Sequence, residues 1–144
     1  MKNILVTIDF DNKEHILVNK ASEFAKAFQA KLWIVHVAAP DPDFVGYEVG
    51  PKYIRDSRAE ELREEHRILQ KFAEEQESKG IACEGLLIQG ATIQMIIEES
   101  IKLNVDLIVA GHHEHGFLYK AFAGSTSSDI IKKSKIPVLL VPLN

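Results

Sequence analysis

The stretch VDLIVAG (residues 105–111) decides the fold class, because its apolar residues follow one another almost without interruption. A strand covered on one face alternates apolar and polar residues, whereas a strand covered on both faces is nearly continuously apolar. Three other runs have the same character: ILVTI (4–8), LWIVHV (32–37) and VLLV (138–141). A weaker run, CEGLLI, covers residues 83–88. We therefore expect a parallel sheet buried between two layers of helices.

Between these runs, apolar residues recur at spacings of three and four positions, which is the pattern of an amphipathic helix. We expect helices within residues 16–28, 53–79, 92–103 and 125–133. Gly80 suits the left-handed position that often follows a helix, so the long second helix is expected to stop there. The residues expected to face the core are Ile16, Leu17, Ala21, Phe24, Ala25, Phe28, Leu62, Ile68, Leu69, Phe72, Ala73, Ile93, Ile96, Ile97, Ile101, Ile130 and Ile131.

The resulting order, β-α-β-α-β-α-β-α-β, predicts a doubly wound, open sheet of five parallel strands with helices on both faces, an α/β fold. In such sheets, ligands bind outside the carboxyl ends of the strands, near the point where the strand order reverses. This rule selects residues 7–9, 36–38 and 110–112, which lie at the ends of three predicted strands. We expect these three segments to line one cleft.

Composition and charge restrict the class of protein. A chain of 144 residues that is 46% hydrophobic and 26% charged is typical of one globular domain, here expected to span residues 1–144. The net charge of -4 argues against nonspecific binding to nucleic acid, and no apolar run is long enough for a membrane span. Cys83 is the single cysteine, and Asp9 and Asp11 interrupt the first apolar run. We therefore expect a cytoplasmic protein without a disulfide or a signal peptide.

A second feature is the segment HHEHGFLYKAFAGSTSS (112–128). In its second half, Gly124 precedes Ser125, Thr126 and Ser127, which begin the last predicted helix. The first turn of a helix has unpaired N–H groups and a positive dipole end, and a glycine lets a ligand come close. Phosphate binding is one interpretation, and a simple helix cap by Ser125 is the other. The spacing fits neither a P-loop nor a dinucleotide fingerprint.

The first half of the same segment permits a different interpretation. His112, His113 and His115 surround Glu114, and imidazole and carboxylate groups are ligands that zinc accepts. His36, at the end of a neighbouring strand, is a further candidate ligand. The alternative is a set of loop histidines that face solvent, and we favour it because adjacent histidines on an irregular loop rarely converge on one ion.

The strands resemble those of a known family. The segments KNILVTID (2–9), IVHV (34–37), VDLIVAG (105–111) and IPVLLVP (136–142) are similar, in order and spacing, to the universal stress protein family. The similarity extends over essentially the whole chain. It implies a Rossmann-like sheet of the adenine-nucleotide alpha-hydrolase type, with the strand order 3-2-1-4-5. It also implies a homodimer formed through the last strand, residues 137–142.

The ATP-binding branch of that family carries the motif G-x2-G-x9-G-[ST]. Gly111, Gly124 and Ser125 reproduce its spacing, but Glu114 stands where the second glycine is expected, and Gly116 follows two residues later. A carboxylate at that position would repel a triphosphate unless it points to solvent or shares a cation. Glu114 is thus the departure that puts ATP binding in question.

The resemblance implies a role for each matching position. The end of the first strand would border the ribose and adenine, and Val37 would offer backbone hydrogen bonds to the adenine edge. Ala110 and Gly111 would flank the ribose and phosphates, which the turn beginning at Gly124 would hold. The full set of expected nucleotide-binding residues is Thr7, Ile8, Asp9, Val37, Ala110, Gly111, Glu114, Gly116, Gly124, Ser125, Thr126 and Ser127.

These features lead to one hypothesis and two alternatives. The hypothesis is a cytoplasmic regulatory module that binds ATP as a homodimer, with AMP or ADP as other candidates and Mg²⁺ or Mn²⁺ as the cation. The first alternative is a nucleotide-free dimeric interaction protein, as Glu114 suggests. The second is a slow ATPase, or a protein that phosphorylates itself. No catalytic residue is assigned, because no nucleophile has an evident base, and we expect that the protein is not an enzyme.

Overall fold

The computed structural model describes residues 1–39, 52–112 and 125–143, without the side chains of residues 52–54 and 125–128. Strands and helices alternate along the chain, as the apolar runs and helical spacings predict. The elements are β1 (Asn3–Thr7), α1 (Glu14–Phe28), β2 (Lys31–Ala38), α2 (Lys52–Ser78), β3 (Cys83–Gln89), α3 (Thr92–Lys102), β4 (Leu107–His112), α5 (Ser125–Lys133) and β5 (Val138–Pro142).

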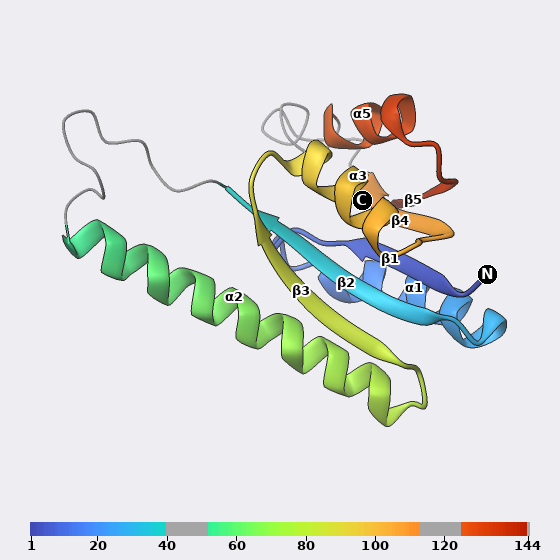
Figure 1. Cartoon of the computed structure of the whole chain (residues 1–144). Helices are drawn as coiled ribbons and strands as arrows, with labels where there is room; N and C mark the ends of the chain where they lie inside the picture. Colours follow the sequence, from blue (N-terminus) through green and yellow to red (C-terminus); the bar gives the residue numbers. More distant parts are fainter. Residues whose placement is uncertain (40–51, 113–124, 144) are drawn as a thin grey trace.

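The five strands form one parallel sheet with the order β3-β2-β1-β4-β5, which confirms the expected α/β fold and its strand order (Figure 1). The order reverses at β1, because β2 follows on one side of it and β4 on the other. Two parallel neighbours therefore flank the end of β1, and this is the point at which ligands of open α/β sheets bind.

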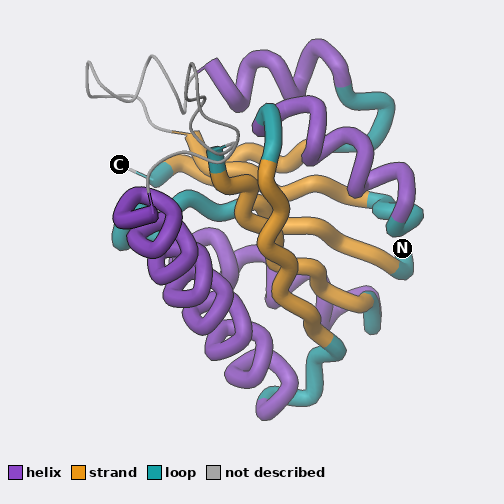
Figure 2. The backbone as a smooth tube through the Cα atoms, turned by 60° about the vertical axis from the view of Figure 1, so that its left-hand side comes forward, coloured by secondary structure: helices purple, strands orange, loops and turns teal. Residues whose placement is uncertain are grey.

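Helices cover both faces of the sheet, with α1 and α2 on one face and α3 and α5 on the other (Figures 1 and 2). Alternate residues of the central strands enter two separate cores. Ile4 and Val6 of β1 pack with α1 and α2, whereas Leu5 packs with the core under α3 and α5, where Ile96 and Ile130 are fully buried. Burial on both faces is the reason that these strands are continuously apolar.

Two glycines fix how the long helix α2 ends and packs. Gly80 has φ of 83°, so it takes the left-handed conformation predicted for the residue after the helix. Gly85 of β3 lies directly under α2, where an added Cβ would come within 2.9 Å of the Leu69 carbonyl oxygen. The missing side chain at Gly85 therefore lets the helix backbone approach the sheet closely.

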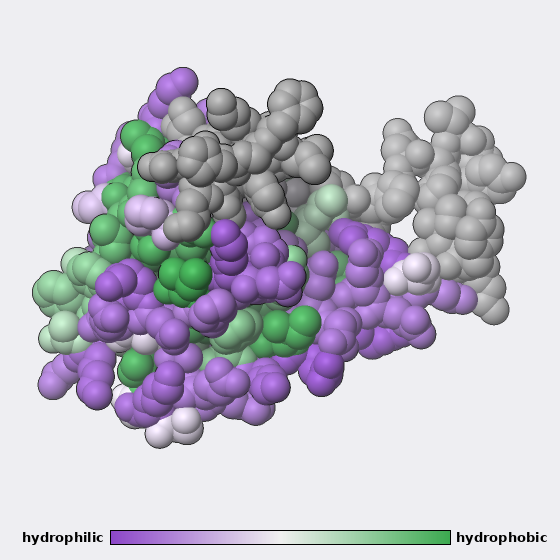
Figure 3. Space-filling model, turned by 180° about the vertical axis from the view of Figure 1, so that it is seen from behind, coloured by the Kyte–Doolittle hydropathy of each residue, from purple (hydrophilic) through white to green (hydrophobic). Residues whose placement is uncertain are grey.

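Four of the residues expected to face the core are exposed instead: Ile16 (37%), Phe28 (49%), Ile101 (67%) and Ile131 (53%). Ile16, Ile101 and Ile131 each stand next to a buried helical residue, so they project about 100° away from it around the helix axis. Phe28 is the last residue of α1. On the face that Figure 3 shows, hydrophobic residues reach the surface in separate groups among hydrophilic ones.

No helix in the described ranges has the length and apolar character that crossing a membrane requires. The longest, α2, has 27 residues, but charged and amide side chains make up most of its outer surface.

Candidate functional site

The carboxyl ends of β1, β2 and β4 lie at one edge of the sheet, and α5 begins at the same edge (Figures 1 and 2). Thr7 is the last residue of β1, and Ile8 and Asp9 follow it. Val37 is next to last in β2, and residues 110–111 lie near the end of β4. The structure thus brings together the strand-end positions that were predicted separately from sequence.

The side chains at this edge are turned mostly into the protein. Ile8, Val37 and Ala110 are 1%, 7% and 3% exposed, and each belongs to one of the two cores. Asp9 is exposed. A ligand at this edge would therefore meet backbone groups at the buried positions, and a carboxylate at Asp9.

The backbone of β2 extends beyond the last rung of its ladder with β1. Alternate residues of a parallel strand bond to the same neighbour. The Lys31 N–H donates to the Lys2 carbonyl at 2.8 Å, and the Ile8 N–H donates to the Val35 carbonyl at 2.9 Å, so the odd-numbered residues of β2 face β1. The next rung would join the Val37 N–H to the Ile8 carbonyl, but it is absent from the hydrogen bonds of the described residues.

The Val37 N–H is left without a hydrogen-bond acceptor among the described residues. A buried backbone N–H without an acceptor is uncommon in native proteins, and such groups often meet water or a ligand. Val37 thus presents a donor at the edge where the strand order reverses, with no acceptor for it in the described part of the chain. A ligand at this edge that carries a hydrogen-bond acceptor could bond to this N–H.

Gly111 proves to have a packing reason for being glycine. A Cβ at this position would lie 2.4 Å from Cδ1 of Leu143 and 3.2 Å from Cδ1 of Leu17. Leu143, just after β5, therefore packs over the backbone of β4, and its N–H donates to the His112 carbonyl at 2.9 Å. Gly111 and Leu143, near the C-terminal end of the chain, therefore pack against each other.

His36 is buried in the structure, which gives it a different role from that of a loop histidine. Its Nδ1 lies 2.7 Å from the Ile8 carbonyl oxygen, and its Nε2 lies 3.7 Å from Oε2 of Glu65 on α2. The Phe10 ring stands 4.5 Å from the imidazole, measured between ring centres. Sequence reasoning missed Glu65, because nothing distinguishes it from the other carboxylates of a highly charged helix.

The metal hypothesis gains no ligand cluster from the described part of the chain, where no three His, Cys, Asp or Glu side chains gather. His112 ends β4, and its buried Nδ1 has no hydrogen-bond partner there. Cys83 is buried on edge strand β3, and burial raises the pKa of its thiol to about 12. His113 and His115 lie outside the described residues.

The remaining predicted site residues are described in part or not at all. Glu114, Gly116 and Gly124 lie outside the described residues. The backbone of Ser125, Thr126 and Ser127 forms the first turn of α5, as predicted, and their side chains lie outside the description.

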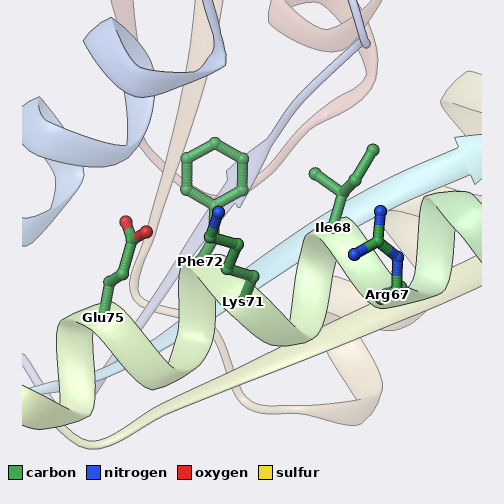
Figure 4. A pocket seen from close by; sticks show the side chains of 5 residues that line it. All are labelled: Arg67, Ile68, Lys71, Phe72 and Glu75. Carbon is green, nitrogen blue, oxygen red and sulfur yellow. The ribbon is translucent and has the colours of Figure 1, made fainter.

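A hollow of about 240 Å³ lies elsewhere, on the second half of α2 (Figure 4). Figure 4 shows the five side chains that line it, all from that helix: Arg67, Ile68, Lys71, Phe72 and Glu75. Arg67 is exposed and paired with Glu64, an arrangement that contributes little stability. The hollow is shallow surface relief on one helix, away from the strand ends, so we assign no site to it.

Comparison with known proteins identifies the family. A model of the universal stress protein family matches residues 1–142. A universal stress protein of Thermus aquaticus is 32% identical over 143 residues, covering 97% of this chain and 98% of the relative.

Two solved structures have the same fold. One is a universal stress protein in complex with cAMP, with 21% identity, a TM-score of 0.70 and coverage of 99% of this chain and 98% of that chain. The other, from Archaeoglobus fulgidus, is in complex with dAMP, with 17% identity, a TM-score of 0.64 and coverage of 97% of each chain. Because the family model spans nearly every residue, the chain belongs to the universal stress protein family.

Proposed function

We propose that this universal stress protein binds an adenine nucleotide at the carboxyl ends of β1, β2 and β4. The observation that carries the proposal is the open rung at Val37, whose N–H faces the end of β1 without an acceptor among the described residues. The cAMP and dAMP complexes of the two structural neighbours support the same ligand class.

The surrounding groups suit the parts of such a ligand. The Val37 backbone would bond the adenine edge, and the exposed carboxylate of Asp9 would accept a hydrogen bond from ribose hydroxyls. The first turn of α5 offers unpaired N–H groups and a positive dipole end to the phosphates. Base, sugar and phosphate would thus each meet a different strand end or helix end.

The finer proposal is ATP with Mg²⁺ or Mn²⁺, bound by a single domain of residues 1–144 in a cytoplasmic homodimer. Its output would be regulatory, because nucleotide binding would change a surface that partners recognise in a stress response. Glu114 favours the alternative, a nucleotide-free dimeric interaction protein. A slow ATPase ranks below both, because no base has been identified for the hydroxyl groups at residues 125–127.

Titration calorimetry with ATP and Mg²⁺, and separately with AMP, tests the proposal. We expect saturable binding that Gly124→Val weakens strongly, because a side chain there would block the helix start. Glu114→Gly should strengthen ATP binding if the carboxylate repels the phosphates. Lys71→Ala, in the hollow on α2, is the matched control and should bind as the unaltered protein does.

Two results would reject the proposal. No heat and no thermal shift at millimolar ATP or AMP would favour the nucleotide-free alternative. Loss of binding in Lys71→Ala, with Gly124→Val unaffected, would move the site to α2. Phosphate release that exceeds the Gly124→Val background would support the ATPase alternative.

A further inference from the structure

The Ile8 carbonyl, which does not accept the Val37 N–H, has another donor beside it. The register of β1 and β2 ends with Thr7 opposite Val35, and one further step would place Ile8 opposite His36. In that continued register the Ile8 carbonyl would accept the N–H of Val37. Instead, that carbonyl oxygen lies 2.7 Å from Nδ1 of His36. The His36 side chain thus lies at the carbonyl oxygen to which the Val37 N–H of the same strand would otherwise donate.

The protonation of the ring follows from its partner. A carbonyl oxygen only accepts hydrogen bonds, so Nδ1 of His36 must carry the proton that it donates to Ile8. This holds whether the imidazole is neutral or charged. The imidazole N–H therefore always donates to the Ile8 carbonyl, to which the Val37 N–H does not bond.

The ring is held in this orientation from two further sides. Oε2 of Glu65, which is buried and has no hydrogen-bond partner among the described residues, lies 3.7 Å from Nε2. The Phe10 ring lies against the imidazole with the planes inclined by 58°. His36 itself is only 9% exposed, so the ring has little room to turn away.

We propose that His36 is a positioning residue of the nucleotide site, which withholds the Ile8 carbonyl from Val37 and so keeps the Val37 N–H open for the adenine edge. This inference rests on the proposed function. It assigns a role to a side chain that does not itself touch the ligand. Without the imidazole, the Val37 N–H would donate to the Ile8 carbonyl, and it would no longer be available to the adenine base.

Amide hydrogen exchange measured by NMR on the ligand-free protein tests the first half of this proposal. The Ile8 amide, which is hydrogen-bonded at the same strand end, serves as the internal reference. We expect the Val37 amide to exchange faster than the Ile8 amide, on the order of tenfold, since it lacks an acceptor. In His36→Leu the two rates should become similar, because the extra rung can form.

Nucleotide titration tests the second half. His36→Leu should weaken AMP binding on the order of tenfold, the effect of one lost hydrogen bond in a buried site. His36→Gln should retain tighter binding than His36→Leu, because its amide can still donate to Ile8. His66→Leu, which changes an exposed histidine of α2, is the matched control and should leave both measurements unchanged.

The outcomes separate the two proposals. If the unaltered protein binds neither AMP nor ATP, the proposed function fails, while the exchange rates still show whether His36 keeps the rung open. If the Val37 amide of the unaltered protein is as protected as that of Ile8, the inference is overturned even if no variant folds. Equal AMP affinity in His36→Leu and the unaltered protein would also overturn it.

Discussion

At the scale of single residues, Gly111 illustrates how one position can satisfy two demands. The motif of the ATP-binding branch predicts a glycine there for the ligand, whereas the structure packs Leu143 and Leu17 over the same backbone. Gly111 does not have a positive φ, so the constraint is one of space and not of conformation. The two accounts make different predictions for an added methyl group.

We expect Gly111→Ala to lower the free energy of unfolding by about 1 kcal/mol, the low end of the overpacking range, because the nearest atom is the end of the flexible Leu143 side chain. The cause is the 2.4 Å approach between the new Cβ and Cδ1 of Leu143. Denaturant unfolding measures the loss. Combining the change with Leu143→Ala should cost less than the sum of the two single changes, because the methyl group then has room.

A contrary result would be equally informative. If Gly111→Ala unfolds like the unaltered protein but loses nucleotide binding, close approach of the ligand, and not packing, explains the glycine.

At the scale of elements, the carboxylate of Asp106, in the turn before β4, is hydrogen-bonded to the backbone at the start of β1. Oδ2 of Asp106 accepts hydrogen bonds from the backbone N–H groups of Lys2 at 2.7 Å and Asn3 at 3.0 Å. The Asp106 N–H in turn donates to the Asn3 carbonyl at 2.8 Å. The hydrogen bonds from Lys2 and Asn3 lower the pKa of the Asp106 carboxyl below its ordinary value.

A lowered pKa in the folded state predicts a pH-dependent contribution to stability. It is fully present above the unfolded-state pKa of about 3.9 and is lost as the pH falls through the lower folded-state pKa. We therefore expect Asp106→Asn to melt at a lower temperature than the unaltered protein at pH 7, with the difference narrowing below about pH 4.

Thermal melts across this pH range measure the effect. Asp56→Asn, at an exposed position of α2, is the matched control and should show no such convergence. A melting difference for Asp106→Asn that stays constant down to the lowest pH would mean that the carboxylate charge is not what stabilises the junction.

The elements were predictable from sequence because each signal is local. Continuous apolar runs gave the strands, and the left-handed Gly80 ended α2 as expected. The errors arose where burial depends on the direction of a side chain around the helix. Ile130 is fully buried and Ile131 is 53% exposed, although both are isoleucines, so residue type alone does not distinguish the two positions.

Of the candidate site, the sequence predicted only which strand ends lie together. The strand-end rule placed Thr7, Val37 and Ala110 at one edge, since it depends on topology alone. The open rung at Val37 could not be predicted, because it depends on the register of β1 and β2 and on the orientation of the His36 ring. Long-range contacts of this kind leave no local signal in a single sequence.

At the scale of the whole molecule, the two edges of the sheet are covered differently. α2 packs along β3, where Gly85 lets the helix approach the strand backbone. β5 forms the other edge, and Val138, Leu139 and Leu140 are only half-buried. A half-buried apolar edge strand favours pairing with another chain, so β5 is the surface we propose for the homodimer.

The ladder indicates which backbone groups would form that pairing. The Ile108 N–H donates to the Pro137 carbonyl, and the Leu143 N–H donates to the His112 carbonyl, so the odd-numbered residues of β5 face β4. The N–H of Leu140 therefore points outward from the sheet. Pro142, also at an outward position, already lacks an N–H.

We predict that Leu140→Pro converts a dimer to a monomer, because it removes the central outward N–H of β5 while leaving the inner ladder intact. Sedimentation equilibrium measures the mass, and circular dichroism should show that the fold is kept. Ile101→Lys, on the exposed surface of α3, is the control and should remain dimeric. If the unaltered chain sediments as a monomer, or if Ile101→Lys dissociates and Leu140→Pro does not, β5 is not the contact.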